Sequence, residues 1–363
     1  QYKDFIFLWQ PIALIFLHLK LKKKKYYEYA GNIENGKVRW TTTIAASAVI
    51  IALFISTLSG LEIGRLIKQW NREFLVSKFG VYVYQLNDVF TSLEPKFNTL
   101  FGYDKAIQNV REYYENNPKE ETNNKYTDIF KGKNLIMIHA ESIQQFLLDT
   151  EFNGQEVTPN LNKLASEGLY FSNFYSQVGV GTSSDTEFTV STSLLPVSSG
   201  TVFMGYFNRE YITIPKMLKE QGYYSVSMHG NNGSFWNRNV MHKNMGYDKF
   251  FHESYYDIDE KIGLGLSDKS FLRQSVEKLK SISSEHTNYY ATLITLTNHT
   301  PFDEIDKYGD FPVTTKVTIE NELGEKEEVQ RDYMEGTSLG NYFKSSHYAD
   351  STLGEFINEM DTE

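Results

Sequence analysis

Short apolar runs alternate with helical patterns over the second half of the chain. Residues 134–140, 223–228 and 289–297 are apolar and of strand length, which is typical of parallel strands buried on both faces. Helical patterns open at Pro159 and cover residues 185–194. This alternation predicts an α/β fold with a mainly parallel, doubly wound sheet.

Other stretches complete the predicted domain. Residues 142–148 and 214–221 are expected to be helices, and residues 169–174 a further strand. Residues 314–330 are rich in Glu, Lys and Thr, which predicts a surface hairpin. Residues 348–360 predict a helix near the end of the chain.

Two apolar runs near the start predict a membrane region over residues 1–61. Residues 5–19 are too few for a comfortable span and are interpreted as the end of a larger one. Residues 40–61 carry no charge and are long enough to cross ~30 Å of hydrocarbon, although a buried helix of a soluble protein has the same pattern. The loop between the runs is basic, with Lys20, Lys22, Lys23, Lys24, Lys25, Lys37 and Arg39.

This charge pattern predicts the topology. Basic loops lie in the cytoplasm, so the chain that follows residue 61 is expected outside the cell, in a multi-pass protein of the cell membrane. Residues 62–130 are predicted to be juxtamembrane helices and a linker, in which residues 63–79 form an amphipathic helix at the membrane surface or an ordinary linker helix. Residues 113–127 are polar and predict the linker itself. Residues 131–363 then form an extracellular catalytic domain.

Three strand ends carry residues suited to chemistry. Glu141, His229 and His299 follow the three apolar runs in turn. Open α/β sheets bind their ligands beyond the carboxyl ends of the strands, and a buried polar group there needs a partner or a function. Alone, Glu141 can simply begin a helix, and each histidine can be structural. Together they predict a hydrolase-type metal site.

A hydroxyl cluster, Gly181-Thr182-Ser183-Ser184-Asp185, stands at the start of a predicted helix. A hydroxyl at a helix N-terminus, beside a metal ion, can attack a phosphoryl or sulfuryl centre. Ser183 and Thr182 are the candidates. The same residues also make an ordinary helix cap, but the strand-end Glu and His residues favour the nucleophile.

Composition narrows the partners and the metal. The formal net charge of −10 argues against nucleic-acid binding. The chain has no Cys, which excludes disulfides and thiolate ligands. A metal ion here must use carboxylate, imidazole or hydroxyl groups, as Mn²⁺, Mg²⁺ and Zn²⁺ do.

Six motifs occur in a fixed order: His139-Ala-Glu141-Ser, Val157-Thr-Pro-Asn-Leu161, Gly181-Thr-Ser-Ser-Asp185, Met228-His229-Gly230, Phe235-Trp236-Asn237-Arg238 and Leu296-Thr-Asn-His299. Together they resemble the lipoteichoic acid synthases of Gram-positive bacteria, within the alkaline phosphatase and sulfatase superfamily. The resemblance implies a sulfatase-like fold preceded by transmembrane helices. It also implies transfer of glycerol phosphate from phosphatidylglycerol to a polyglycerophosphate chain or a glycolipid acceptor, by a Thr nucleophile and Mn²⁺.

The resemblance also implies roles for residues of the site. Glu141 corresponds to the metal-binding Glu, and Ser183 falls where the nucleophilic, metal-bound Thr stands, whereas Thr182 lies one residue early. The residues that correspond to the glycerol phosphate site are His229, Trp236, Arg238 and His299, with Asn231 in place of the usual Asp. Histidines outside these motifs are expected to be structural, namely His18, His242, His252, His286 and His347.

The family completes its metal site with a later Asp-His pair that this chain lacks up to Glu363. Because Gln1 is not an initiator either, we expect a fragment without both termini, which carries only Glu141 and Ser183 of the metal site and is inactive alone. Three hypotheses follow. The first is a glycerophosphotransferase of lipoteichoic acid synthesis. The second is a related phosphatase, sulfatase or phosphoethanolamine transferase. The third is a non-catalytic envelope-binding protein.

Overall fold

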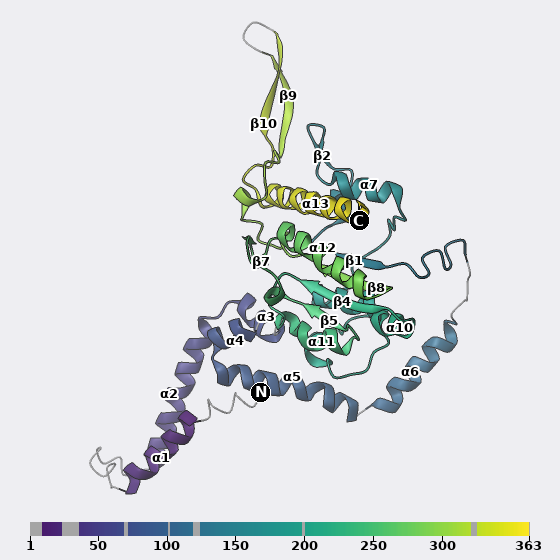
Figure 1. Ribbon diagram of the computed structural model, residues 1–363. Coiled ribbons are helices and arrows are strands. Elements are labelled where there is room, and N and C mark those ends of the chain that lie inside the picture. Colours follow the sequence, from purple (N-terminus) through teal and green to yellow (C-terminus); the bar gives the residue numbers. More distant parts are fainter. Residues whose placement is uncertain are drawn as a thin grey trace. The chain divides into compact units, whose positions relative to one another are not determined.

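The computed structural model describes residues 9–23, 36–68, 72–100, 102–118, 124–197, 200–320 and 325–362. It divides into two compact units, Gln1–Ile63 and Gly64–Glu363 (Figure 1). The first unit consists of α1 (Trp9–Lys23), α2 (Gly36–Ser56) and the start of α3 (Gly60–Lys68).

The apolar helix α2 ends earlier than the sequence predicts. Residues 40–61 are not one helix, because α2 stops at Ser56 and α3 starts anew at Gly60. Ser59 and Glu62 form a reciprocal cap: the Ser59 N–H donates to Glu62 Oε2 (2.8 Å), and the Glu62 N–H donates to Ser59 Oγ (3.2 Å). Within the described ranges no single helix meets the length and hydropathy of a membrane span, whereas the pair Trp40–Ser56 and Gly60–Leu66, bent by 104°, meets them together.

The second unit starts with helices that precede the sheet. They are the rest of α3, α4 (Arg72–Phe79), α5 (Val81–Leu100) and α6 (Tyr103–Asn116). The amphipathic stretch 63–79 is therefore divided between α3 and α4, with residues 69–71 outside the described ranges. The predicted linker at residues 113–127 overlaps the end of α6, which continues to Asn116.

A four-stranded sheet forms the centre of the second unit, in the order β1-β8-β4-β5, and every neighbouring pair is parallel. Its strands are β1 (Leu135–His139), β4 (Tyr224–His229), β5 (Lys249–Phe251) and β8 (Tyr289–Ile294). Ile294 of the middle strand is in register with His139 on one side and His229 on the other. The three predicted strands therefore end level with one another.

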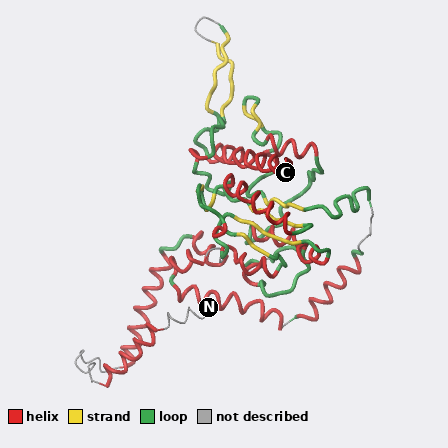
Figure 2. Tube along the Cα trace, viewed as in Figure 1, coloured by secondary structure: helices red, strands yellow, loops and turns green. Residues whose placement is uncertain are grey.

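Helices cover both faces of this sheet (Figures 1 and 2). Val226, Met228 and Leu293 point to one face and belong to a core shared with α12 (Asp268–Glu285) and α13 (Ser338–Thr362). Tyr290 points to the other face and packs with Phe188 of α8 (Ser183–Thr192). Further helices on that face are α9 (Val202–Gly205), α10 (Ile214–Glu220) and α11 (Arg238–Asn244). The predicted doubly wound, parallel α/β fold is confirmed.

Smaller elements complete the unit. They are α7 (Pro159–Glu167), the pairs β2 (Glu151–Phe152) with β3 (Gln155–Glu156) and β6 (Lys261–Ile262) with β7 (Gly265–Leu266), and the hairpin β9 (Thr314–Glu320) with β10 (Lys326–Asp332). The predicted hairpin is confirmed, although its turn lies outside the described residues. The predicted helix at 348–360 is the second half of α13.

Two local predictions are wrong. Residues 142–148 form only a short 3₁₀ turn at Gln145–Leu147, because Ser142 has a φ of 57° and breaks any helix that starts there. Residues 169–174 form a loop rather than a strand, and Phe171 is 71% exposed. Their aromatic residues favour strands, but none of the described strands pairs with them, and strand propensity depends on such neighbours.

Candidate active site

Glu141 lies just beyond the end of β1, and the segment after β8 holds its backbone. The Glu141 N–H donates to Thr295 Oγ1 (2.9 Å), and its carbonyl accepts from Asn298 Nδ2 (3.2 Å). These bonds connect the ends of two adjacent parallel strands. The carboxylate of Glu141 is therefore presented at a fixed place on the ligand-binding edge of the sheet.

Ser183 begins α8, and its hydroxyl points at this carboxylate. Ser183 Oγ donates to Glu141 Oε2 over 2.8 Å, and the side chain is half-buried. Thr182 precedes the helix with a φ of 44°, is exposed, and makes no cap hydrogen bond. The structure thus pairs Ser183, not Thr182, with Glu141.

A buried carboxylate fixes the turn that presents Ser183. Asp185 Oδ2 accepts from the N–H groups of Gly179 and Gly181, each at 2.9 Å. A Cβ on Gly181 would lie 2.3 Å from Asp185 Oδ1, so only glycine fits there. The Gly-Thr-Ser-Ser-Asp motif is therefore a compact turn in which both glycine and Asp have structural functions.

Most of the predicted site residues line one cavity of about 490 Å³. Its walls are Arg65, Glu141, Thr182, Ser183, His229, Phe235, Trp236, Arg238, Leu264, Leu296, His299, Thr300 and Pro301. The cavity brings Glu141, both hydroxyl candidates and the predicted phosphate-binding residues to one place. Asn231 is the exception: it does not line this cavity, and its Oδ1 accepts from the Asn232 N–H (2.6 Å).

His229 is a buried, neutral imidazole. Its Nδ1 lies 2.9 Å from the Ile294 carbonyl, which can only accept, so Nδ1 carries the proton. Nε2 is then an acceptor, and it has no partner among the described residues. Burial, followed by the charge of Arg238, lowers the pKa of His229 to about 3. His229 therefore offers the cavity a lone pair that can accept a hydrogen bond from a substrate hydroxyl.

This pKa predicts how acid affects stability. A histidine that is neutral in the fold stabilises it fully above its ordinary pKa of 6.5, and this contribution is lost as pH falls from there towards about 3. We expect His229→Gln to reduce the acid-side slope of the unfolding free energy by about 1.4 kcal/mol per pH unit, the value for one proton. Urea unfolding between pH 4 and 7 measures this slope, and unchanged slopes would contradict the prediction. The buried His242 has a lowered pKa too and leaves a residual slope in the variant.

Arg238 starts α11 and is 2% exposed. Trp236 and Asn237 before it both have a positive φ, of 54° and 58°, and Asn237 Nδ2 donates to the buried Phe203 carbonyl (2.9 Å). This anchored left-handed turn aims the indole and the guanidinium into the same cavity. His299 completes the wall as a half-buried residue whose Nδ1 lies 2.7 Å from the Thr300 carbonyl.

Comparison with known proteins agrees with these motifs. Residues 133–363 match the family model described as Sulfatase. The chain belongs to the sulfatase family. This sulfatase-family chain is 32% identical to Lipoteichoic acid synthase 2 of Bacillus subtilis (strain 168), over 98% of this chain and 51% of that protein. It is 34% identical to Lipoteichoic acid synthase of Staphylococcus aureus (strain USA300), over 89% of this chain and 49% of that protein.

A solved structure shows the same similarity. The crystal structure of the lipoteichoic acid synthase LtaP from Listeria monocytogenes superposes with a TM-score of 0.59 at 31% identity, over 67% of this chain and 56% of that one. The predicted resemblance to the lipoteichoic acid synthases is confirmed. The sulfatase-family chain spans about half the length of the curated relatives it matches.

Glu141 and Ser183 are the residues of the sulfatase-family chain that the sequence predicts to bind a metal ion. Across the described residues, no group of three or more His, Cys, Asp or Glu side chains is arranged to hold a metal ion. Glu141 and Ser183 provide two converging oxygen atoms, which suit a hard cation, but two ligands are fewer than protein sites use. That Glu141 and Ser183 belong to a metal site stays a prediction from the sequence.

The structure also adds residues that the motifs do not single out. Arg65 of α3 lines the cavity, and its guanidinium lies 5.2 Å from the Phe74 ring centroid. Asp268 accepts from the N–H groups of Leu296 and Thr297 (2.7 and 2.9 Å), and burial raises its pKa to about 7. Asp268 carries no sequence signal beyond its place in a first helical turn.

His242, expected to be merely structural, bonds to a buried Glu187 (2.8 Å) that also pairs with Arg238 (2.7 Å). Glu187 carries no signal in the sequence except its position four residues after Ser183. Glu187 and His242 also line a second cavity, together with His139 and Phe174, which is described below.

Proposed function

We propose that this chain is part of a membrane-anchored glycerophosphotransferase, which moves glycerol phosphate from phosphatidylglycerol to a lipoteichoic acid chain or its primer. The observation that carries the proposal is the Ser183–Glu141 hydrogen bond of 2.8 Å, inside a cavity that also holds His229, Trp236 and Arg238. A carboxylate-paired hydroxyl beside a guanidinium is the arrangement that nucleophilic attack on a phosphodiester needs. The names of the relatives support the substrate class.

The residues suggest a two-step reaction. Ser183 Oγ attacks phosphorus and gives its proton to Glu141, which already accepts its hydrogen bond. The bond from phosphorus to the diacylglycerol oxygen breaks, and diacylglycerol leaves after this oxygen takes the proton from Glu141. A hydroxyl of the acceptor chain, hydrogen-bonded to His229 Nε2, then attacks the serine-linked glycerophosphoryl group. Its proton passes to Glu141 and from there to the departing Ser183 oxygen, which restores the Ser183 hydroxyl.

The remaining residues would bind and orient the group that is transferred. Arg238 would bind the phosphate oxygens, and Trp236 and His299 would enclose the glycerol. A divalent ion, Mn²⁺ by resemblance, with Mg²⁺ or Zn²⁺ as alternatives, would lower the pKa of the Ser183 hydroxyl when bound there. Asn231, which does not line the cavity, would act on this site only indirectly.

We also propose that the protein lies in the cell membrane with the sulfatase domain outside. The support is the apolar, bent helix pair Trp40–Ser56 and Gly60–Leu66, together with the basic residues before it. Phosphatidylglycerol is then supplied from the outer face of the same membrane. Residues 62–130 would connect the membrane region to the domain at residues 131–363.

The alternatives make different predictions about substrates. A phosphoethanolamine transferase or phosphatase shares the nucleophile but not the glycerol specificity, and a binding protein turns nothing over. A formylglycine sulfatase needs a Cys or Ser followed by x-Pro-x-Arg, and Ser183-Ser-Asp-Thr-Glu187 lacks both the Pro and the Arg. The motif thus disfavours sulfate esters although the family is named for them.

The test uses the intact protein in vesicles with Mn²⁺ present. We expect diacylglycerol release from phosphatidylglycerol and transfer of labelled glycerol phosphate to a glycolipid acceptor. Vesicles of phosphatidylethanolamine serve as the matched control and should give no release. Release from both lipids would replace the proposal by a less specific phosphodiesterase, and no release from either would favour the envelope-binding protein.

A further inference from the structure

A buried charged network lies directly behind the proposed phosphate site. Arg238, Glu187 and His242 are 2%, 7% and 2% exposed. Arg238 donates to Glu187 from Nε (3.0 Å) and from Nη2 (2.7 Å), and His242 Nε2 lies 2.8 Å from the other Glu187 oxygen. Ser227 Oγ of β4 lies 2.8 Å from His242 Nδ1 and closes the chain of contacts.

We propose that Glu187 and His242 are positioning residues, which hold Arg238 in the orientation that binds the substrate's phosphate. This inference rests on the proposed function. It extends that function to two residues that touch neither the nucleophile nor the expected substrate. Three features support it. They are the N–H groups of Arg238 that Glu187 does not occupy, the position of Glu187 on the same helix as Ser183, and the proton positions in the network.

Arg238 keeps a suitable edge for phosphate because Glu187 occupies the other one. A guanidinium has five N–H groups, and the carboxylate takes the side formed by Nε and Nη2. The end formed by Nη1 and the second Nη2 hydrogen remains for the cavity, which Arg238 lines. Two parallel hydrogen bonds to phosphate oxygens are still possible from that end, and Glu187 prevents the group from rotating.

Glu187 also connects this arginine to the nucleophile. Ser183 and Glu187 are four residues apart on α8, so both side chains lie on the same side of the helix. Ser183 contacts Glu141 at the start of the helix, and one turn later Glu187 binds Arg238 of α11. The ion pair therefore fixes the separation between the attacking hydroxyl and the phosphate-binding group.

The protonation states suit a fixed support. Burial raises the pKa of Glu187, but the charge of Arg238 and the contacts of His242 outweigh it and hold that pKa far below its usual range. Burial lowers the pKa of His242, which is therefore neutral. An ionised carboxylate only accepts, so His242 Nε2 carries the proton and Nδ1 accepts from Ser227. Every group in the network then has a defined donor or acceptor role.

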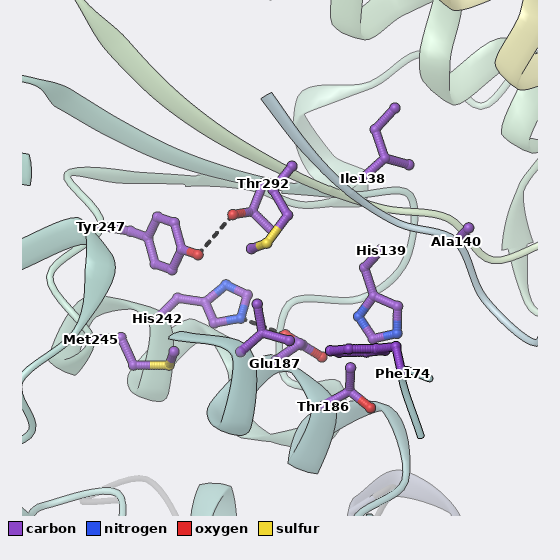
Figure 3. Close-up of a pocket in the computed structure, with 12 residues that line it drawn as sticks. Ile138, His139, Ala140, Phe174, Thr186, Glu187, His242, Met245, Tyr247 and Thr292 are labelled. Atoms are coloured by element: carbon purple, nitrogen blue, oxygen red, sulfur yellow. Dashed lines mark hydrogen bonds and ion pairs between the residues drawn. The ribbon is translucent and has the colours of Figure 1, made fainter. Parts of the chain in front are cut away.

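Hydrogen bonds rather than packing hold Glu187 on its far side. A second cavity of about 210 Å³ lies there, lined by Glu187 and His242 together with Phe174, Tyr247 and Thr292 (Figure 3). Figure 3 shows the His242–Glu187 contact at the edge of this cavity and the separate Tyr247–Thr292 hydrogen bond. Without its bonds to His242, the Glu187 carboxylate has space to turn away from Arg238.

The experiment measures binding of free glycerol phosphate to the intact protein by calorimetry, expressed per mole of folded protein. We expect Glu187→Gln to raise the Kd by roughly 10- to 100-fold, because it removes the charge that orients Arg238. Glu220→Gln, at an exposed position of α10, is the matched control and should leave the Kd unchanged. A folded Glu187→Gln protein with the wild-type Kd would overturn the proposal.

A second pair of variants decides the question if Glu187→Gln does not fold. His242→Gln keeps a donor for Glu187 and an acceptor for Ser227, whereas His242→Phe removes both. We expect the Kd to stay within about twofold for Gln and to rise about 3- to 10-fold for Phe. Equal Kd values would overturn the proposal, since a purely structural role changes only the folded fraction.

Failure of this proposal is distinguishable from failure of the proposed function. If the protein binds glycerol phosphate through this network yet does not turn over phosphatidylglycerol, the transferase proposal fails and the positioning role remains. If turnover is normal in folded Glu187→Gln protein, the positioning role fails and the transferase proposal remains.

Discussion

Replacing Ser183 with alanine is expected to reduce diacylglycerol release from phosphatidylglycerol by at least about 1,000-fold in the intact protein if the proposed transferase function holds, as loss of the nucleophile does in enzymes that use one. The reason is geometric. Ser183 Oγ is the hydroxyl that lies 2.8 Å from Glu141 Oε2, and alanine leaves that carboxylate without its partner. Release of labelled diacylglycerol, measured under single-turnover conditions, tests the covalent step directly.

Two companion variants make this test specific. Ser183→Thr keeps a hydroxyl at the same position, so activity should remain within about tenfold. Thr182→Ala should have an effect far smaller than Ser183→Ala, because Thr182 is exposed and precedes α8. If Thr182→Ala abolished release and Ser183→Ala did not, the assignment of the nucleophile would be reversed.

Replacing Arg238 with methionine is expected to have the largest effect on stability, about 3–5 kcal/mol of the unfolding free energy. Glu187 is ionised and 7% exposed, and without Arg238 it would keep only His242 as a donor. Loss of one partner from a buried pair leaves an uncompensated charge, which costs more than the pair itself contributes. Urea unfolding of the folded domain measures the change, as a shift in the transition midpoint.

A double variant separates this stability effect from binding. Arg238→Met combined with Glu187→Leu removes both charges and should recover most of the lost stability, because a buried pair replaced by apolar residues is close to neutral. Glycerol phosphate binding should stay lost in both proteins, since both lack the guanidinium. Recovered binding in the double variant would show that Arg238 does not contact the phosphate.

The sequence alone determined the fold class and predicted many of the residues that line the candidate site. Apolar runs at 134–140, 223–228 and 289–297 have the period and length of buried parallel strands, and the structure places β1, β4 and β8 there. Glu141, His229 and His299 follow these runs directly. Because carboxyl ends of parallel strands meet at one edge, their convergence could be inferred without coordinates.

Local signals failed where tertiary contacts decide the outcome. Residues 169–174 have strand-forming side chains but no paired strand within the described part of the chain. Residues 142–148 do not form the predicted helix, because Ser142 has a left-handed backbone conformation. The helix break before Gly60 coincides with the Ser59–Glu62 cap, whose sequence signal is weaker than that of the apolar run around it.

Only the tertiary structure decided which groups work together at the site. Thr182 and Ser183 both carry a hydroxyl that could act as the nucleophile. The first turn of α8 points the Ser183 hydroxyl at Glu141. Glu187 and His242 belong to no sequence motif. Their proposed function depends on a contact between α8 and α11, and the two residues are 55 positions apart in the chain. The spacing of residues along the chain predicts which side chains lie at the ends of strands. The orientation of each hydrogen-bond donor and acceptor is set by packing in three dimensions.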